Sequence, residues 1–180
     1  MKDTRKIAVI GAGRVGAATA YTLSLSALAG EIVLLDVDER RARGEALDIA
    51  HGLPLYAALE VKSGGYDDIA NADLVIITAG VGQKSGETRM ELLDRNRAVF
   101  ASIVPEVVRS APNAVLLVVT NPVDILTLET LRLSGLPAER VIGTGTVLDT
   151  SRLKYLLSRH TGVDPRNIHA CVLGEHGDGE

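Results

Sequence analysis

A glycine-rich turn between a short apolar segment and a helical pattern constrains the fold of this 180-residue chain more than any other feature. The apolar segment 6–10 leads into the turn Gly11-Ala-Gly13-Arg-Val-Gly16, and residues 15–27 then have helical character. In such a turn the first glycine permits a tight bend, the second lets the backbone approach a pyrophosphate, and the third lets the helix pack on the strand. The helix would also present unpaired backbone N–H groups to the phosphates. The turn therefore predicts a strand–turn–helix unit that binds a dinucleotide.

Strand and helix signals alternate along the rest of the chain. Residues 74–78 and 115–119 are apolar on both faces, as in parallel strands covered by helices on either side. Pro105 lies in the amphipathic pattern between them, and we expect it to kink that helix or shift its start. The other expected strands are 32–35, 60–63 and 140–142, and the other expected helices end near 51, 133 and 160.

This alternation predicts an α/β fold with a doubly wound, Rossmann-type parallel sheet, whose ligand crevice lies at the carboxyl ends of the strands. We expect residues 1–147 to form this domain. Residues 148–180 would form the truncated start of a second, α+β domain, with a strand at 167–173.

Composition narrows the class of protein. The chain is 46% hydrophobic and 23% charged, which is typical of a globular protein, and its net charge of −4 argues against nucleic acid or an anionic membrane as partner. No apolar run reaches the roughly 18 residues that a membrane span requires. The single Cys171 suits a reducing compartment, and no signal peptide is evident, so we expect a cytoplasmic protein. No metal ligand is assigned.

Asp36 supports the dinucleotide interpretation. It closes the second expected strand 20 residues after Gly16, where a carboxylate can accept hydrogen bonds from ribose hydroxyls. The same charge would repel a 2′-phosphate, which favours NAD over NADP. Arg40 and Arg41 could offset that repulsion, but on a charged helix we expect both to face solvent.

Two short strings near the end of the chain carry candidate catalytic groups. Leu148-Asp149-Thr150-Ser151-Arg152 places a carboxylate and a guanidinium three residues apart, on one face of a helix. A guanidinium can hold a carboxylate through two parallel hydrogen bonds, although a pair at this spacing, taken alone, is more often a plain intrahelical salt bridge. In Gly174-Glu-His176-Gly-Asp178 an imidazole follows the last expected strand. A facing carboxylate would fix its tautomer and stabilise its protonated form.

Together these motifs resemble the lactate/malate dehydrogenase family, and within it most closely the bacterial L-lactate dehydrogenases. The resemblance runs along the whole chain. Five motifs in the same order carry it: the glycine turn, Thr78-Ala-Gly-Val-Gly-Gln-Lys-Ser-Gly-Glu-Thr-Arg89, Asn121-Pro-Val-Asp124, Leu148–Arg152 and Gly174–Asp178.

The resemblance implies an NAD-dependent enzyme that transfers hydride reversibly between NADH and pyruvate, giving (S)-lactate. His176 would exchange the proton with the substrate oxygen, Asp149 would be its partner, and Arg152 would anchor the substrate carboxylate. Asn121 would contact both nicotinamide ribose and substrate, with a cis bond to Pro122. Asp124 would also belong to the substrate site.

The segment from Gly80 to Arg89 resembles the family's mobile lid. Gly80, Gly82 and Gly86 would give it hinge freedom, and closure would bring Arg89 onto the substrate carbonyl oxygen. Gln83 occupies the position at which malate dehydrogenases of this family carry arginine. A neutral amide suits the methyl group of pyruvate, whereas a dicarboxylate needs a cation there, although the neighbouring Lys84 could partly supply one.

Further contacts follow the family pattern. The positions at which relatives touch NAD are Val15, Arg41, Tyr66, Gly80, Val81, Ser102, Val119, Thr120 and Thr144. Relatives activated by fructose 1,6-bisphosphate use an arginine and a histidine where this chain has Lys154 and His169. His169 therefore matches the family pattern. Lys154 differs from it, because a lysine keeps the positive charge but cannot form the two parallel hydrogen bonds that an arginine makes with a phosphate.

Three functions remain open at this point: an L-lactate dehydrogenase given as a fragment, a malate or other 2-hydroxyacid dehydrogenase, and a non-catalytic NAD-binding module. Family members are considerably longer, and the full-length protein would be a homotetramer. The 180-residue chain itself is expected to bind NAD at best weakly and to turn over slowly or not at all.

Overall fold

The computed structural model describes residues 5–177, with the side chain of Arg89 outside the described part. This region contains a six-stranded, all-parallel sheet with strand order β3-β2-β1-β4-β5-β6. The strands are β1 (Lys6–Ile10), β2 (Glu31–Leu35), β3 (Glu60–Ser63), β4 (Leu74–Ile77), β5 (Val115–Val118) and β6 (Val141–Gly143). The helices are α1 (Arg14–Ser26), α2 (Glu39–Gly52), α3 (Arg89–Ser110), α4 (Val123–Ser134) and α5 (Val147–Thr161). The doubly wound sheet that the sequence predicts is confirmed, and the order of strands reverses between β1 and β4.

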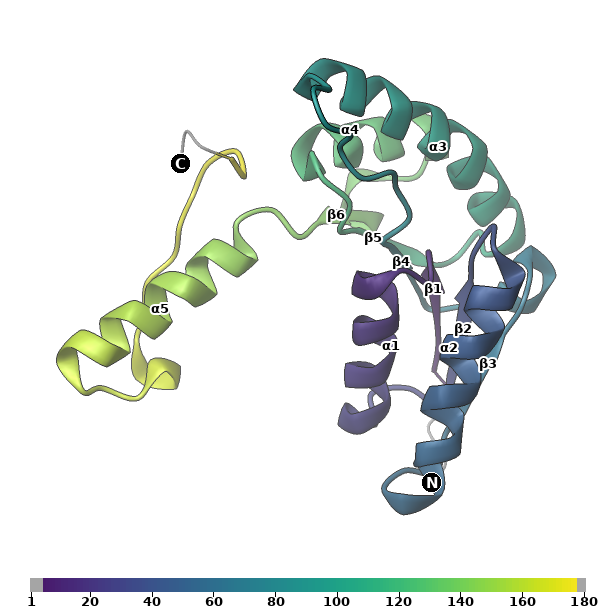
Figure 1. Cartoon of the computed structure of the whole chain (residues 1–180), viewed down its shortest axis with the longest axis horizontal. Helices are drawn as coiled ribbons and strands as arrows, with labels where there is room; N and C mark the ends of the chain where they lie inside the picture. Colours follow the sequence, from purple (N-terminus) through teal and green to yellow (C-terminus); the bar gives the residue numbers. More distant parts are fainter. Residues whose placement is uncertain (1–4, 178–180) are drawn as a thin grey trace.

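The sheet is covered on both faces (Figure 1). Ala8 and Ile10 of β1 belong to the buried cluster that includes residues of α3 and α4. Ile7 and Val9, which alternate with them, belong to the cluster that includes residues of α1 and α2. Since successive side chains of a strand point to opposite faces, a strand that is apolar throughout serves both layers.

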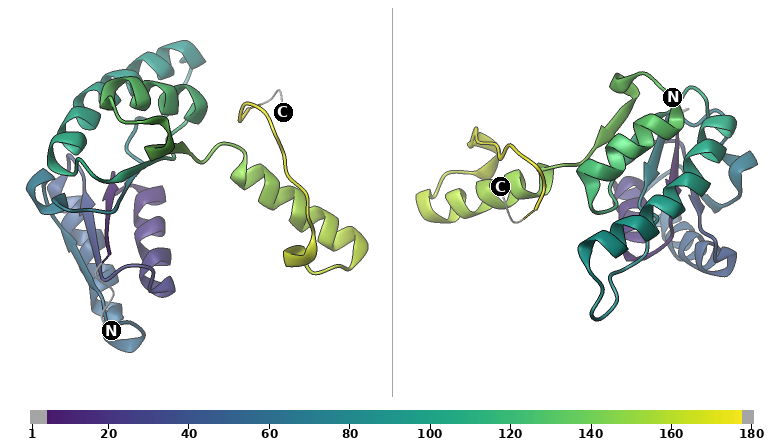
Figure 2. Two further views of the ribbon diagram at one scale, coloured as in Figure 1. Left: turned by 180° about the vertical axis from the view of Figure 1, so that it is seen from behind. Right: turned by 90° about the horizontal axis from the view of Figure 1, so that it is seen from above.

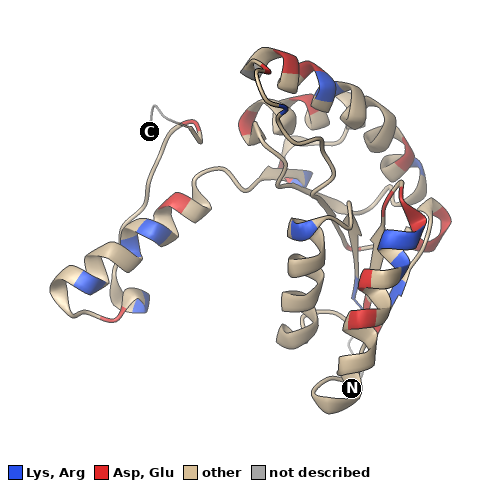
Figure 3. Cartoon of the chain, viewed as in Figure 1, with Lys and Arg blue, Asp and Glu red and all other residues tan. Residues whose placement is uncertain are grey.

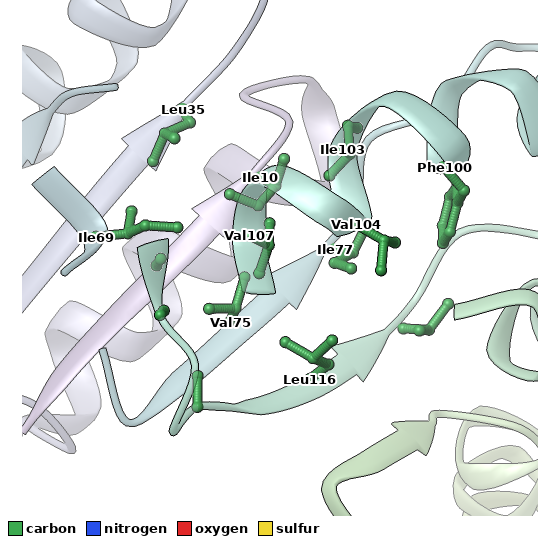
Figure 4. Packing of buried hydrophobic residues seen from close by; sticks show 14 of the residues in the cluster. Ile10, Leu35, Ile69, Val75, Ile77, Phe100, Ile103, Val104, Val107 and Leu116 are labelled. Atoms are coloured by element: carbon green, nitrogen blue, oxygen red, sulfur yellow. The ribbon is translucent and has the colours of Figure 1, made fainter. Parts of the chain in front are cut away.

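Phe100 is the only phenylalanine of the chain, and it is fully buried in the larger cluster. Figure 4 shows it on α3 beside Val104, above the side chains of β4 and β5. Pro105 follows in the same helix and does not shift its start, because α3 begins at Arg89 and continues through Pro105 to Ser110. Val104 and Val107 on either side are fully buried, and this packing offsets the backbone hydrogen bond that a proline cannot donate.

Helix α5 extends away from the sheet and the other helices, and the C-terminal segment returns alongside it (Figures 1 and 2). None of its described residues is buried, and Val147, Tyr155 and Leu156 are more than half exposed. The one acidic residue of this helix, Asp149, lies near its start and is followed by basic residues, whereas acidic and basic residues are interspersed on α2 and α3 (Figure 3). The returning segment is attached through Val172, whose carbonyl accepts a hydrogen bond from Thr146 Oγ1 and whose N–H donates to Thr150 Oγ1.

The strand expected at 167–173 is wrong. Residues 165–167 form one turn of 3₁₀ helix, and 168–173 have no regular secondary structure. A strand requires a neighbouring strand for its ladder of hydrogen bonds, and α5 offers side-chain hydroxyls instead. The prediction came from local apolar character, which does not supply that partner.

Candidate active site

The glycine turn brings β1, α1 and β4 into close contact. Gly11 has a φ of +99°, and a Cβ there would lie 2.7 Å from the Cα of Ala79. A Cβ on Gly16 would lie 1.8 Å from the carbonyl oxygen of Gly11, so only glycine lets α1 approach the strand this closely. Gly13 precedes the helix, and a Cβ there would meet no atom within 4 Å, so this side of the turn is open.

The start of α1 is suited to an anion. Its N-cap, Gly13, provides no side-chain hydrogen bond, and its first turn contains no acidic residue. The N–H groups of a helix's first turn have no partner within the helix, and they carry the positive end of the helix dipole. A pyrophosphate could therefore bind there without competing with a protein carboxylate.

Asp36 follows β2 and is held by two backbone groups. Its Oδ2 accepts the N–H of Ala12 at 2.7 Å, and its Oδ1 accepts the N–H of Asp38 at 2.9 Å. The carboxylate thus connects the glycine turn to the start of α2. Each oxygen retains a second lone pair, which is the acceptor that a ribose hydroxyl would need.

A cleft of about 920 Å³ runs along this edge of the sheet. Its volume lies in the upper part of the range typical of cofactor sites. Predicted cofactor residues that line it are Gly11, Gly13, Asp36, Arg41, Tyr66, Gly80, Val81 and Ser102. The cleft's other lining includes Ser63, Gly64 and Gly65 after β3, which the sequence analysis did not single out. The turn, the anion site and Asp36 together fit a dinucleotide.

The other predicted cofactor residues lie elsewhere. Gly16 is packed behind the turn, and Val15 is 55% exposed on α1, beside a separate shallow depression. Val119, Thr120 and Asn121 follow β5, and Thr144 follows β6. Thr120 Oγ1 donates to the carbonyl of Ala79 at 2.8 Å, which joins the end of β5 to the segment after β4. The bond between Asn121 and Pro122 is cis, as the sequence analysis expected.

His176, Asp149 and Arg152 form one connected group. His176 Nδ1 lies 2.7 Å from Asp149 Oδ2, and Arg152 Nη1 donates to Asp149 Oδ1 at 3.0 Å. The intrahelical salt bridge and the carboxylate–imidazole pair are therefore both present. Partial burial raises the pKa of the Asp149 carboxyl, but the His176 hydrogen bond and charge and the Arg152 hydrogen bond outweigh it, so that the pKa lies below its usual value. Because Nδ1 is the ring nitrogen that binds Asp149, the imidazole turns its Nε2 away from that carboxylate, on the side where a substrate could exchange a proton with it.

This group does not line the cleft. It lies on α5 and in the C-terminal turn, whereas the cleft is lined by the carboxyl ends of strands, the segments that follow them, α2 and α3. Asp124 joins the two parts, because its Oδ2 accepts the backbone N–H of His176 at 2.8 Å from the first turn of α4. Asp178 of the last motif lies outside the described residues.

The predicted lid folds back on itself around Glu87. Glu87 accepts the N–H of Lys84 at 2.8 Å and the guanidinium of Arg95 at 2.6 Å. These two interactions hold the pKa of Glu87 below its usual value. Gln83 Nε2 donates to the carbonyl of Glu87, so the amide is turned toward its own loop. The Arg89 side chain lies outside the described part.

One hinge expectation needs correction. A Cβ on Gly80 would lie 2.5 Å from Thr120 Cγ2 and 2.9 Å from Asn96 Oδ1, so Gly80 is packed rather than free. Gly82 and Gly86 have open space around them, and Gly86 has a φ of +78°. Within the predicted lid, open space around the glycines therefore begins after Val81.

Asn96 is a residue whose side chain the sequence analysis did not recognise as polar support for the site. It is 1% exposed and hydrogen-bonds two loops at the sheet edge. The sequence did contain a sign of this role, because Asn96 is an amide at a position of the helical pattern that is otherwise apolar, between Leu93 and Phe100.

The two residues of the expected fructose 1,6-bisphosphate site lie in the α5 arm. Lys154 is on α5, and the exposed His169 is in the segment that returns alongside it.

Comparison with known proteins identifies the family to which the chain belongs. Residues 5–143 match the NAD-binding domain of lactate/malate dehydrogenases, and residues 146–180 match the α/β C-terminal domain of the same family. The chain belongs to the lactate/malate dehydrogenase family.

Particular relatives are L-lactate dehydrogenases. The chain is 56% identical over 179 residues to one from Clostridium perfringens, covering 99% of this chain and 56% of the relative. It is 57% identical over 180 residues to L-lactate dehydrogenase 1 of Clostridium acetobutylicum, covering 100% and 58% respectively. A solved minor L-lactate dehydrogenase of Enterococcus mundtii superposes with a TM-score of 0.95 at 45% identity, over 97% of this chain and 56% of that one. The chain thus spans about half the length of the curated relatives it matches. Within residues 5–177, no helix is both long and apolar enough to cross a membrane.

Proposed function

We propose that this chain is the amino-terminal part of an NAD-dependent L-lactate dehydrogenase, which interconverts pyruvate and (S)-lactate. The observation that carries the proposal is the connected group His176–Asp149–Arg152, formed by residues 27 and 3 positions apart. It combines a proton-transferring imidazole, an orienting carboxylate and an anion-binding guanidinium, and the same chain has a dinucleotide cleft. We propose that residues 1–147 form the NAD-binding domain and that residues 148–180 are the start of the substrate domain, which carries the His176–Asp149–Arg152 group.

Each group has a defined task in the proposed reaction. NAD supplies the hydride acceptor, and as NADH the donor. His176 gives a proton to the carbonyl oxygen during reduction and takes it from the hydroxyl during oxidation. Asp149 holds the imidazole in one tautomer and stabilises its protonated form. Arg152 orients the substrate carboxylate through paired hydrogen bonds.

Further residues complete the proposed site. Asn121 holds the nicotinamide ribose and the substrate, Asp124 positions the His176 turn, and Arg89 stabilises the developing negative charge on the substrate oxygen when the lid closes. Asp36 binds the adenosine ribose, and Gly11, Gly13 and Gly16 accommodate the pyrophosphate. Supporting NAD contacts are assigned to Val15, Arg41, Tyr66, Gly80, Val81, Ser102, Val119, Thr120 and Thr144.

We also propose pyruvate rather than oxaloacetate as substrate, because Gln83 brings no positive charge to the lid. Lys154 and His169 are proposed to bind the phosphates of fructose 1,6-bisphosphate as an activator. The full-length enzyme is proposed to be a cytoplasmic homotetramer that serves glycolysis and fermentation.

The experiment that tests this function adds to the chain the carboxyl-terminal part that its relatives have. A chimera would join this chain to the carboxyl-terminal part of the Clostridium acetobutylicum relative, which it matches over all 180 residues. We expect pyruvate-dependent oxidation of NADH, and loss of turnover but retention of NADH binding in His176→Asn. A chimera that binds NADH and reduces no keto acid would favour the non-catalytic module. Preference for oxaloacetate would favour a malate dehydrogenase.

A further inference from the structure

Asn96 is a buried amide in a helix that is otherwise apolar on this side. It is 1% exposed, and Leu93 and Phe100, three and four residues away on the same helix face, are also buried. Burying an amide is unfavourable unless its hydrogen bonds are replaced. Here they are replaced by backbone groups from two loops.

The two loops are the ones that carry proposed functional residues. Asn96 Oδ1 accepts the N–H of Val81 at 2.8 Å, at the point where the lid begins. Asn96 Nδ2 donates to the carbonyl of Asn121 at 3.3 Å and to the carbonyl of Val81 at 3.5 Å. One side chain therefore joins the segment after β4 to the segment after β5.

The surrounding packing makes this connection rigid. Gly80 leaves no room for a side chain between Asn96 and Thr120, and Thr120 Oγ1 donates to the carbonyl of Ala79. The two loops are thus held from both sides, by a hydroxyl and by an amide. Beyond Val81 the space around Gly82 is open.

We propose that Asn96 is a positioning residue, which fixes the immobile end of the lid and the backbone of Asn121 relative to each other. This inference rests on the proposed function for the roles of the lid and of Asn121. Asn96 does not line the cleft, so it would act on ligand binding through Asn121 and Val81. Its consequence is that the lid pivots after Val81 while Asn121 stays in place.

Two substitutions of Asn96 distinguish the acceptor role of its Oδ1 from the donor role of its Nδ2. Asn96→Asp keeps the acceptor for Val81 but replaces the donor to Asn121 with an oxygen. Asn96→Leu is of similar size and removes both. Thr130→Val is the matched control, because Thr130 is also fully buried but donates only to Leu126 of its own helix, at 2.7 Å.

The readouts are amide hydrogen exchange and the NAD⁺ dissociation constant from titration calorimetry, both on the 180-residue chain. We expect Asn96→Leu to reduce protection of the Val81 N–H by about tenfold, the size expected for one lost hydrogen bond, and Asn96→Asp to preserve that protection. Both variants should weaken NAD⁺ binding by about tenfold, since the Asn121 bond is lost in each. Thr130→Val should change neither value.

Unchanged Val81 exchange in Asn96→Leu, or NAD⁺ affinity in Asn96→Asp equal to that of Thr130→Val, would overturn the proposal. If the parent chain binds NAD⁺ too weakly to titrate, the dissociation constants are measured on the chimera, and a chimera that binds no NAD⁺ would refute the proposed cofactor site. The exchange data then decide separately whether Asn96 holds the lid.

A measurement on the unaltered chain covers the case in which the variants do not fold. The Nδ2 protons of Asn96 should exchange at least about tenfold more slowly than those of the exposed Asn71. Equal rates would contradict the hydrogen bond to Asn121 and with it the proposal.

Discussion

The carboxylate of Asp124 accepts a hydrogen bond from the backbone N–H of His176 at 2.8 Å. Asp124 lies at the start of α4, within the body of the sheet domain, whereas His176 lies in the turn that follows the α5 arm. This bond connects the two parts of the proposed active site. It also explains how a histidine near the end of a projecting segment can have a defined position.

Replacement of Asp124 by alanine should release the His176 turn. Hydrogen bonds to charged groups contribute roughly 1.5–3 kcal/mol, so protection of the His176 N–H should fall by about tenfold or more. Exchange measured by NMR provides the test, and kcat of the chimera should fall with it. Asp164→Ala is the control, since Asp164 lies in the same arm but binds Arg166. Equal exchange in the two variants would separate Asp124 from the positioning of His176.

Replacement of Asp36 by serine should weaken NAD⁺ binding and relax the discrimination against NADP⁺. The change removes the repulsive charge and also the acceptor for the N–H groups of Ala12 and Asp38. We expect NAD⁺ affinity to fall by about tenfold and the ratio of NAD⁺ to NADP⁺ affinity to fall with it. Calorimetric titration with both cofactors measures this ratio. Asp48→Ala, which removes an exposed carboxylate of α2 outside the cleft, should leave the ratio unchanged, and an unchanged ratio in Asp36→Ser would argue against the ribose contact.

The parts of the structure that the sequence predicts well are those whose signals are local. The apolar run of β4 is buried on both faces because its own residues specify both layers. The spacing of the three glycines likewise marks the turn within six residues, although Gly11 then packs against the distant Ala79. The strand expected at 167–173 fails because a ladder partner is a property of distant sequence. Asn96 was overlooked for the same reason: helical periodicity identifies a buried position, but only the folded chain shows that Val81 and Asn121 meet there.

The lid shows a second reason why the sequence predicts only part of the site: residue type alone does not tell which glycines have room to act as hinges. Glycine content predicted three hinges, and the structure leaves open space at Gly82 and Gly86 but packs Gly80 against Thr120. Backbone freedom is a property of the residue type, whereas the room to use it depends on tertiary contacts.

Phe100 should be a principal source of the stability of the sheet domain. Truncating a fully buried phenylalanine leaves a cavity, so Phe100→Ala should lower the free energy of unfolding by about 3–5 kcal/mol. Phe100→Leu should cost less, because most of the volume remains filled. Urea denaturation of the 180-residue chain measures both. Equal losses would mean that the site collapses around either side chain.

The conformation of the lid should depend on pH through Glu87. The Lys84 N–H and the Arg95 guanidinium lower the pKa of this carboxyl in the folded chain. A lowered pKa means that both contacts are fully present above the usual glutamate pKa of about 4.3 and are lost as the pH falls through the lower, folded value. The NMR shift of the Lys84 N–H should therefore titrate in that acid range. In Glu87→Gln the transition should be absent, whereas Glu91→Gln, which affects the separate pair with Thr88, should retain it. A Lys84 titration that survives in Glu87→Gln would assign it to another group.

The choice of substrate should depend on Gln83. In the chain its amide donates to the carbonyl of Glu87, so lid closure must exchange that bond for the substrate environment. An arginine there would bring the positive charge that the second carboxylate of oxaloacetate needs when water is excluded, because an unpaired charge in such a site is strongly disfavoured. We expect Gln83→Arg in the chimera to raise kcat/KM for oxaloacetate relative to pyruvate by about tenfold or more, as befits one charge-assisted hydrogen-bonded pair.

Two companion variants separate charge from shape. Gln83→Met has similar length without charge and should keep the preference for pyruvate. Lys84→Met removes the neighbouring ammonium, and any remaining oxaloacetate reduction by the parent chimera that disappears in this variant came from Lys84. If Gln83→Arg and Gln83→Met show the same substrate ratio, then side-chain charge at this position does not select the keto acid, and selection must come from residues that the lid closes against.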